Sequence, residues 1–223
     1  MTLEQLIAQF RIDAQDRAEP YFWPDVVVTD WLNEAQAEAA IRARLIHESA
    51  NTDVCQIAVV AGMSVYPLHA ALYELTYQAF IGEDGKRYPL RQVSIEWLDD
   101  NVPRWRNGEG PGIPRWLVQT DNSLRVAPTP KLAGSIVLEG YRLPLAELSA
   151  STDVPEINAA HHRHLVDWAL HRAFSIPDSE SFDAQRAGQA EAAFSVYFGL
   201  APDADLRRST RADNPQVCEA CWP

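Results

Sequence analysis

The amino-terminal stretch of the chain has the apolar spacing of one helical face. Its apolar side chains stand at positions i, i+3, i+4 and i+7, namely Leu3, Leu6, Ile7 and Phe10. Thr2 and Gln5 have the spacing of a capping box, in which each side chain bonds the backbone N–H of the other residue. The pattern predicts a first helix from Thr2 to about residue 17, which the two prolines of residues 19–24 end.

A second helical pattern follows this proline-containing segment. We expect the helix over residues 30–48, with Thr29 or Asp30 as its N-cap. The segment 19–24 itself holds three aromatic residues and is expected to pack against the protein. Alanine-rich composition favours the helix, and its apolar face consists of Leu32, Ala35, Ala39 and Ile46.

The period of the apolar positions changes to two from about residue 52, which indicates strands. Residues 83–86 have the composition of a hairpin turn. Ser94 is placed to cap a short helix over 94–100, and a loop rich in glycine and proline is expected over 101–115. The predicted strands are 53–60, 64–68, 73–79, 88–93, 116–120, 124–127 and 135–142.

Helical spacing returns after residue 153. Residues 156–174 are apolar on most sides, which predicts a central, buried helix, and Pro155 suits its first turn. A last helix is expected over 182–198, ended by Gly199. From residue 200 onward the chain has three prolines and few apolar side chains, so it is predicted to be an extended arm.

Together these elements predict an α+β fold: an α-helical bundle of two amino-terminal and two carboxy-terminal helices, interrupted by a β-rich insertion. We expect the bundle over residues 1–50 and 154–199, the insertion over 51–153 and the arm over 200–223. A chain of 223 residues buries about 70% of its unfolded surface, so it needs neither disulfides nor a metal to fold.

The charge balance bears on the class of partner. The chain carries 19 basic and 31 acidic side chains, a formal net charge of −12, and short basic groups such as Arg42/Arg44 are flanked by acids. Because proteins that bind nucleic-acid phosphates tightly carry a basic patch, we do not expect tight phosphate binding here. The acidity favours solubility, and a second interpretation is that it keeps nucleic acid from sticking.

The remaining composition excludes several classes of protein. No run reaches the roughly 18 apolar residues of a membrane helix. The first residues lack the pattern of a secretory signal, so we expect the protein to fold and act where it is synthesised. Three cysteines are too few for a disulfide scaffold. Cys218 and Cys221 have CxxC spacing without a redox or zinc context, and we expect them, like Cys55, to be unpaired thiols.

Metal chemistry has one candidate, a group of histidines in the predicted helix 156–174. His164, Asp167 and His171 stand at i, i+3 and i+7, beside His161 and His162, and can share a helical face. Zinc hydrolases commonly use histidines at i and i+4, and here only Asp167 and His171 have that spacing. A metal-dependent hydrolase is one hypothesis. We favour the other, a polar stripe on a buried helix, and expect no metal and no cofactor.

Other catalytic patterns are missing from the sequence. Residues 108–112 have the glycines of a phosphate loop, but Pro111 removes a donor and no Lys-Ser/Thr follows. There is no Gly-x-Ser-x-Gly elbow. We therefore expect no enzyme. Trp97, Trp105 and Trp116 bracket the same loop, and they either pack the core of the insertion or anchor a partner.

The order of several short stretches resembles the head-to-tail adaptor (connector) proteins of tailed bacteriophages, which dock beneath the portal. Each stretch alone is weak, whereas their joint order is specific. They are 28–36 (VTDWLNEAQ), 59–68 (VVAGMSVYPL), 112–116 (GIPRW), 124–130 (LRVAPTP) with Gly134, 141–144 (YRLP), 155–157 (PEI), 165–170 (LVDWAL) and 172–174 (RAF). The tail beyond Gly199 matches least well.

The resemblance implies a structural protein of the virion neck that is assembled in the host cytoplasm. Copies would form a dodecameric ring under the portal and extend the DNA channel, with no catalysis and no membrane. The implied partners are the portal protein, further copies of the chain, a downstream tail or nozzle protein, and double-stranded DNA that passes through the lumen. A tail-completion or stopper protein of the neck is the alternative.

The carboxy-terminal arm of such proteins looks suited to reach into the portal or a neighbouring subunit. On this arm we expect the contacts to be made by Leu206, Arg207, Arg208, Arg211 and Trp222. An acidic lumen without lysine clusters is compatible with a conduit in which DNA must slide.

Overall fold

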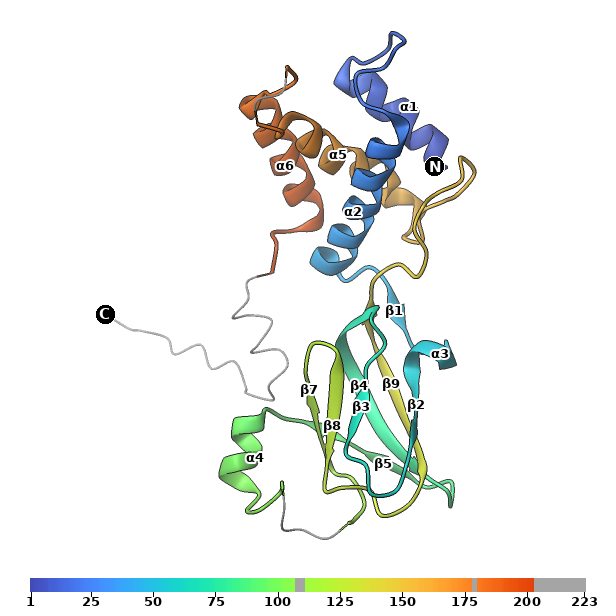
Figure 1. Ribbon diagram of the computed structural model, residues 1–223, viewed down its shortest axis with the longest axis vertical. Coiled ribbons are helices and arrows are strands. Elements are labelled where there is room, and N and C mark those ends of the chain that lie inside the picture. The colour runs from blue at the N-terminus through green and yellow to red at the C-terminus, as the bar shows by residue number, and fades with distance from the viewer. Residues whose placement is uncertain (107–110, 178–179, 203–223) are drawn as a thin grey trace, which may run out of the picture. The chain divides into compact units, whose positions relative to one another are not determined.

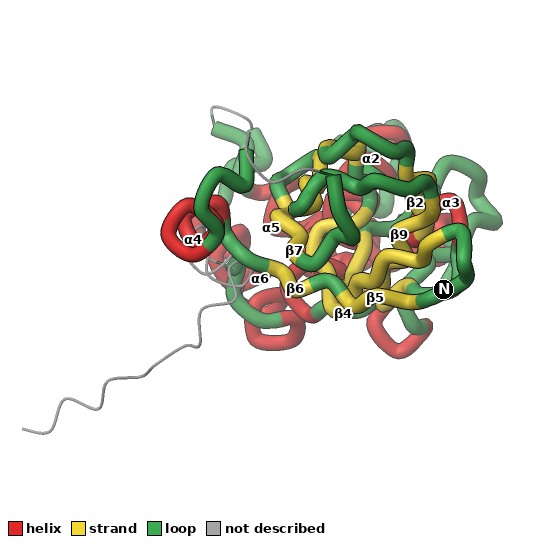
Figure 2. The backbone as a smooth tube through the Cα atoms, turned by 90° about the horizontal axis from the view of Figure 1, so that it is seen from below, coloured by secondary structure: helices red, strands yellow, loops and turns green. Residues whose placement is uncertain are grey.

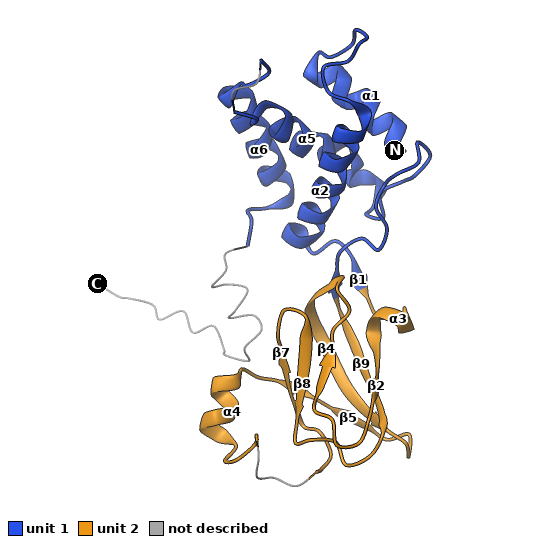
Figure 3. Cartoon of the chain, in the orientation of Figure 1, with its two compact units in different colours: residues 1–47, 141–202 blue, residues 48–140, 203–223 orange. Residues whose placement is uncertain are grey.

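The computed structural model describes residues 1–106, 111–177 and 180–202 of the chain. Two compact units divide these residues, one made of 1–47 with 141–202 and the other of 48–140 (Figure 3). Helices build the first unit and strands dominate the second (Figure 1). The predicted α+β class is confirmed.

The first unit is made of four α-helices and a short 3-10 helix. They are α1 (Leu3–Ala14), α2 (Asp25–Ala43), the 3-10 helix η1 (Ala159–His164), α5 (Leu165–Phe174) and α6 (Ala184–Phe198). α5 contacts α1, α2 and α6, as the apolar pattern of its sequence predicts. Phe10 of α1, Leu32 of α2, Leu165 of α5 and Phe194 of α6 are fully buried in one core.

Local capping fixes several of these helix ends. Thr2 and Gln5 form the predicted capping box, and Gly199 follows α6 with a φ of +94° that favours glycine. α2 begins at Asp25 and not at residue 30, because Pro24 is its N-cap and the Thr29 hydroxyl donates to the Asp25 carbonyl inside the helix. It ends at Ala43, before the left-handed Arg44, and not at residue 48.

The predicted helix over 156–174 also begins later. Glu156 stays outside it because its carboxylate accepts hydrogen bonds from Arg142 and from the backbone N–H of Leu145. The Asn158 side chain then accepts from the N–H of Ala160 and caps η1. The first helical turn is therefore a 3-10 turn at 159–164, and Pro155 is not part of it.

The second unit contains two sheets that pack face to face. One sheet has the order β1-β9-β4-β5, with β2 also paired to β9, and the other has the order β3-β8-β7-β6. The strands are β1 (His47–Glu48), β2 (Gln56–Val59), β3 (Val65–Pro67), β4 (Leu72–Gly82), β5 (Arg87–Pro89), β6 (Arg91–Gln92), β7 (Trp116–Gln119), β8 (Ser123–Ala127) and β9 (Gly134–Arg142). Their shared core contains Leu72, Ile136 and Leu138 from one sheet and Leu117 and Leu124 from the other.

Two short helices complete this unit. α3 (Thr52–Cys55) occupies the start of the stretch predicted as a strand over 53–60, because the Asn51 side chain caps it through the N–H of Asp53. α4 (Ile95–Asn101) is capped by Ser94, as predicted, and lies beside the β3-β8-β7-β6 sheet (Figure 2). A second, smaller core forms there from Val93, Leu98, Val102, Trp105, Val118 and Ala127.

The segment 141–153 belongs to the first unit by its contacts, although the sequence pattern assigned it to the insertion. Asn33 holds the backbone of Leu148 through two hydrogen bonds of 2.8 and 3.0 Å, and Leu148 is buried in the helical core. The backbone N–H of Leu3 also donates to the Asp153 carbonyl at 2.8 Å. The division into a bundle, an insertion and an arm as functional domains stays a prediction.

Candidate functional site

The five arm residues that we expect to contact a partner lie outside the described residues. They are Leu206, Arg207, Arg208, Arg211 and Trp222, and Cys218 and Cys221 lie there too. Cys55 is buried in the core of the second unit. The role of the arm therefore stays a prediction, and the candidate surfaces below belong to the two units.

The histidine group does not form a metal site. His164 Nδ1 lies 3.3 Å from Asp167 Oδ2, but His171 turns its Nδ1 to the Ala187 carbonyl at 3.1 Å. The ring of His164 stacks on Tyr197, with 3.6 Å between the ring centroids. Within the described ranges, no three His, Cys, Asp or Glu side chains come together in a way that could hold a metal ion. The geometry gives no support to the hydrolase hypothesis.

The remaining histidines have structural partners. His162 is 1% exposed, and its Nε2 lies 2.9 Å from the Ile157 carbonyl while its Nδ1 lies 2.7 Å from the Met1 nitrogen. His161 Nδ1 lies 3.1 Å from the Tyr197 hydroxyl. Burial raises the pKa of Asp167, and the contact with His164 opposes that rise. His161 and His171 join η1 and α5 to α6, and His162 fixes the amino terminus, as a polar stripe on a packed helix would.

The three tryptophans near the Gly/Pro loop chiefly pack the small core beside α4. Trp105 is buried, whereas Trp97 and Trp116 are half-buried, with 6.3 Å between their ring centroids. Trp105 Nε1 donates to Asp99 Oδ1 at 2.8 Å. The packing interpretation therefore holds for Trp105, whereas Trp97 and Trp116 remain partly exposed to solvent.

Arginines from three separate segments lie over these rings. The guanidinium carbon of Arg91 is 5.1 Å from the Trp97 centroid, and those of Arg106 and Arg125 are 4.5 and 5.4 Å from the Trp105 centroid. We call Arg91, Trp97, Trp105, Arg106, Trp116 and Arg125 the Arg–Trp surface. The sequence showed no basic patch because these arginines are far apart in the chain; sheet pairing brings them together.

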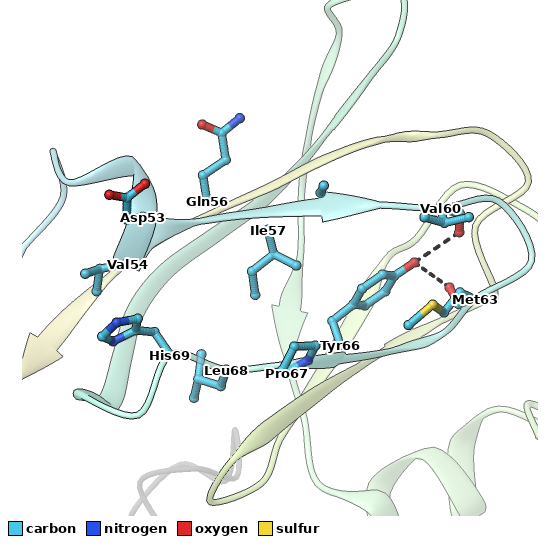
Figure 4. A pocket seen from close by; sticks show the side chains of 11 residues that line it. Asp53, Val54, Gln56, Ile57, Val60, Met63, Tyr66, Pro67, Leu68 and His69 are labelled. Carbon is cyan, nitrogen blue, oxygen red and sulfur yellow. Dashed lines mark hydrogen bonds between the residues drawn. The ribbon is translucent and has the colours of Figure 1, made fainter.

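A hollow of about 460 Å³ lies between β2 and β3, which follow one another in the chain but belong to different sheets (Figure 4). Apolar side chains such as Ile57 and Met63 line it. The Tyr66 hydroxyl donates to the Met63 carbonyl at 2.6 Å, and burial raises the pKa of Tyr66. His69 accepts from the backbone N–H of Ala71 through Nδ1. No nucleophile and base are hydrogen-bonded to each other among these described lining residues, so the hollow offers shape and no evident acid–base chemistry.

Among the described residues, no helix combines the length and the apolar character that a membrane crossing requires.

Comparison with known proteins places the chain in a family. The family model described as SU10 adaptor protein matches residues 1–216, nearly the whole chain. No curated protein matches the chain.

Proposed function

This chain belongs to the SU10 adaptor protein family, and from that premise we propose that it forms a ring below the portal and continues the DNA channel toward the tail. At the coarser level the family makes the chain a structural adaptor protein of a bacteriophage virion, which works through contacts with portal and tail proteins. The family match over residues 1–216 is the observation that carries the proposal.

The chemistry of the described residues supports a role in assembly. The hollow has no hydrogen-bonded nucleophile and base among its described lining residues, and the ring of His164, which contacts Asp167, is stacked on Tyr197. Large apolar side chains instead lie in water on the first unit, including Val196 at 88% and Leu200 at 82% exposure. Covering such exposed apolar groups with another protein removes them from water, which contributes favourably to the free energy of association.

In a ring, one surface of each copy contacts a different surface of the next copy, and a rotation axis relates the copies. In the proposed assembly the copies are twelve in number by the family resemblance, and double-stranded DNA passes through their lumen without sequence-specific contacts. The net charge of −12 is compatible with a wall that does not retain DNA. The arm over residues 200–223 is proposed to reach into the portal or a neighbouring copy.

The experiment is co-sedimentation of the purified chain with the portal protein encoded in the same genome. The chain alone is expected to sediment as a monomer or weak oligomer, and the mixture as one complex larger than the portal. A chain that sediments unchanged beside the portal contradicts the proposal. If it instead joins a preformed complex of portal and another neck protein, it acts as a stopper.

A further inference from the structure

A second hollow, of about 440 Å³, lies in the helical unit between the loop that joins α1 to α2 and residues 180–183, which precede α6. Phe22 of the first segment and Phe182 of the second line it, and they are 50% and 53% exposed. The buried rings of Trp23 and Phe174 also line it, with 5.6 Å between their centroids. We call these four aromatic residues the aromatic recess.

The charged side chains around this recess are mostly engaged within the same copy. Four of them belong to its described lining. Asp16 is held in an ion pair with Arg11, and Asp183 is the N-cap of α6. Arg186 donates to a backbone carbonyl of α1 at 3.0 Å, and Glu180 is exposed to water. The recess therefore offers a partner chiefly the faces of aromatic rings.

The other end of α6 carries an apolar projection. Val196, in the last turn of the helix, is 88% exposed, and Leu200, just beyond the helix, is 82% exposed. The exposed residues Ala192 and Ala193 precede them and add neither charge nor bulk. We call Val196 and Leu200 the α6 projection. Two large aliphatic side chains exposed to this degree are favourable only when another protein surface covers them.

The recess and the projection lie at opposite ends of one helix. The recess adjoins the start of α6, at the end of the helical unit where the loop between α1 and α2 also lies (Figure 1). The twelve steps from Ala184 to Val196 correspond to about 18 Å along the helix axis. Because the helix is rigid, the projection of one copy cannot fill the recess of the same copy.

We propose that the α6 projection of one copy packs into the aromatic recess of the next copy. This inference rests on the proposed ring and names the two surfaces that close it. One surface is hollow and the other protrudes, and both are apolar, so they match in shape and in polarity. The volume of the recess falls in the range of about 300–1,000 Å³ that pockets for small molecules have, which is enough for two aliphatic side chains.

The same contact repeats from copy to copy. Every copy carries both surfaces, and a contact between two unlike surfaces leaves one of each free for a further copy. A second copy is therefore favoured over a different protein, which would have to bring its own complement to each surface. Repetition of such a contact gives a closed ring when the rotation between copies closes.

Opposite charges test the contact in the assembled ring. We expect V196K and F182E each to raise the concentration needed for half-maximal ring formation on the portal by about tenfold or more, because each leaves an unpaired charge in an apolar contact. V196K/F182E brings the two charges together across every contact and is expected to recover most of the loss.

The variants are chosen so that folding does not explain the result. Both positions are more than half exposed, and each charge lies at the helix end whose dipole favours it. We therefore expect urea midpoints close to that of wild type. V60K is the matched control, because Val60 is a valine of the second unit that is 58% exposed.

Cross-linking identifies the two surfaces directly. Cys218 and Cys221 are replaced by serine, and Cys55 is buried, so an introduced cysteine has little background. In rings of mixed V196C and F182C copies, we expect a short bismaleimide to join the two thiols of neighbouring copies. Rings of V196C copies alone, and rings that mix V60C with F182C, are expected to give no such product.

Three results would overturn the inference while the proposed function stands, because wild type still forms its ring in each of them. V196K and F182E assemble as wild type does, or the double variant assembles no better than the single variants, or the mixed cysteine rings give no link between copies. If V196C links to the portal instead, the projection binds the portal and the inference is wrong. A wild-type chain that forms no ring on the portal ends both proposals.

Discussion

Arg11 and Asp16 form an ion pair in which both side chains are buried, with 2.6 Å between Nη1 and Oδ2. Asp16 also accepts from the backbone N–H of Phe22 at 2.9 Å, and Arg11 donates to the Trp23 carbonyl at 2.9 Å. The Arg11 guanidinium lies 3.7 Å from the ring centroid of Tyr21. The pair therefore fixes the backbone of the segment between α1 and α2 at Phe22 and Trp23. Trp23 is buried in the helical core, whereas Tyr21 and Phe22 are 38% and 50% exposed, so the expected packing of this loop holds for Trp23 alone.

Removing the cation of this pair should destabilise the protein strongly. Arg11→Met leaves the buried carboxylate of Asp16 without its partner, and we expect the free energy of unfolding to fall by about 3–5 kcal/mol. Urea unfolding measures the change. Arg17→Met, at an exposed position beside the same loop, is the control and is expected to change stability by about 0.5 kcal/mol at most. Equal midpoints for the Arg11 variant and wild type would show that the pair is not needed.

Gly140 of β9 lies directly against the backbone of β4. A Cβ at this position would lie 2.2 Å from the Glu74 carbonyl oxygen, so Gly140→Ala must push backbone apart. We expect a loss of about 1–3 kcal/mol in the free energy of unfolding. Gly188 on α6 has open space around its Cα, and Gly188→Ala is expected to stabilise the helix by about 0.5–1 kcal/mol. The same sign for both substitutions in urea unfolding contradicts the packing described here.

Ionisation of Asp167 lowers the free energy of unfolding. Because burial raises its pKa in the folded state, the native protein binds more protons than the unfolded chain between the ordinary pKa and the raised one. Stability contributed by this group therefore falls as pH rises through that window. Asp167→Asn should raise the free energy of unfolding at pH 7, and the difference from wild type should vanish below about pH 4.

Asp153 provides the opposite case. Its pKa is lowered, chiefly by hydrogen bonds from the backbone N–H groups of Ser149 and Ala150. Its contribution is present at neutral pH and is lost as pH falls through the lowered pKa. Asp153→Asn should therefore destabilise at pH 7. Urea unfolding of both variants over a pH series checks the two signs, and an Asp167→Asn protein less stable than wild type at pH 7 would show that the His164 contact outweighs burial.

The sequence predicted those features that short-range signals determine. The Thr2–Gln5 capping box, the Ser94 cap and the Gly199 end were read correctly because each depends on residues within one turn. The start of α2 was wrong because Asp30 is also a good cap, and nothing local shows that the chain turns earlier, at Pro24. Glu156 was assigned to a helix because its partner Arg142 is distant in the chain.

The candidate surfaces were less predictable than the fold. Arg91 and Arg125 come together through the register of β6, β7 and β8, which the alternation of apolar residues does not specify. The histidine pattern suggested one shared face, and His164 and His171 do both contact α6, but each ring is taken by a structural partner, Tyr197 or the Ala187 carbonyl. Spacing alone could not reveal the bond to the Ala187 carbonyl.

The arm should be dispensable for folding and necessary for docking. Gly199 ends α6, and Leu200 is 82% exposed, so deletion of residues 200–223 removes little from the helical core. We expect the same urea midpoint within error and no capture by immobilised portal. The triple variant R207E/R208E/R211E tests the charges of the arm without shortening it. A shortened chain that still binds the portal would show that the arm is not needed for docking.

The central claim is that copies of this chain assemble as a ring on the portal. Electron micrographs of the purified chain mixed with the portal of the same genome test it most directly. We expect a closed ring of added density on one face of the portal, with one channel running through both proteins. Portal particles without added density, or added density that is not a closed ring, would contradict it.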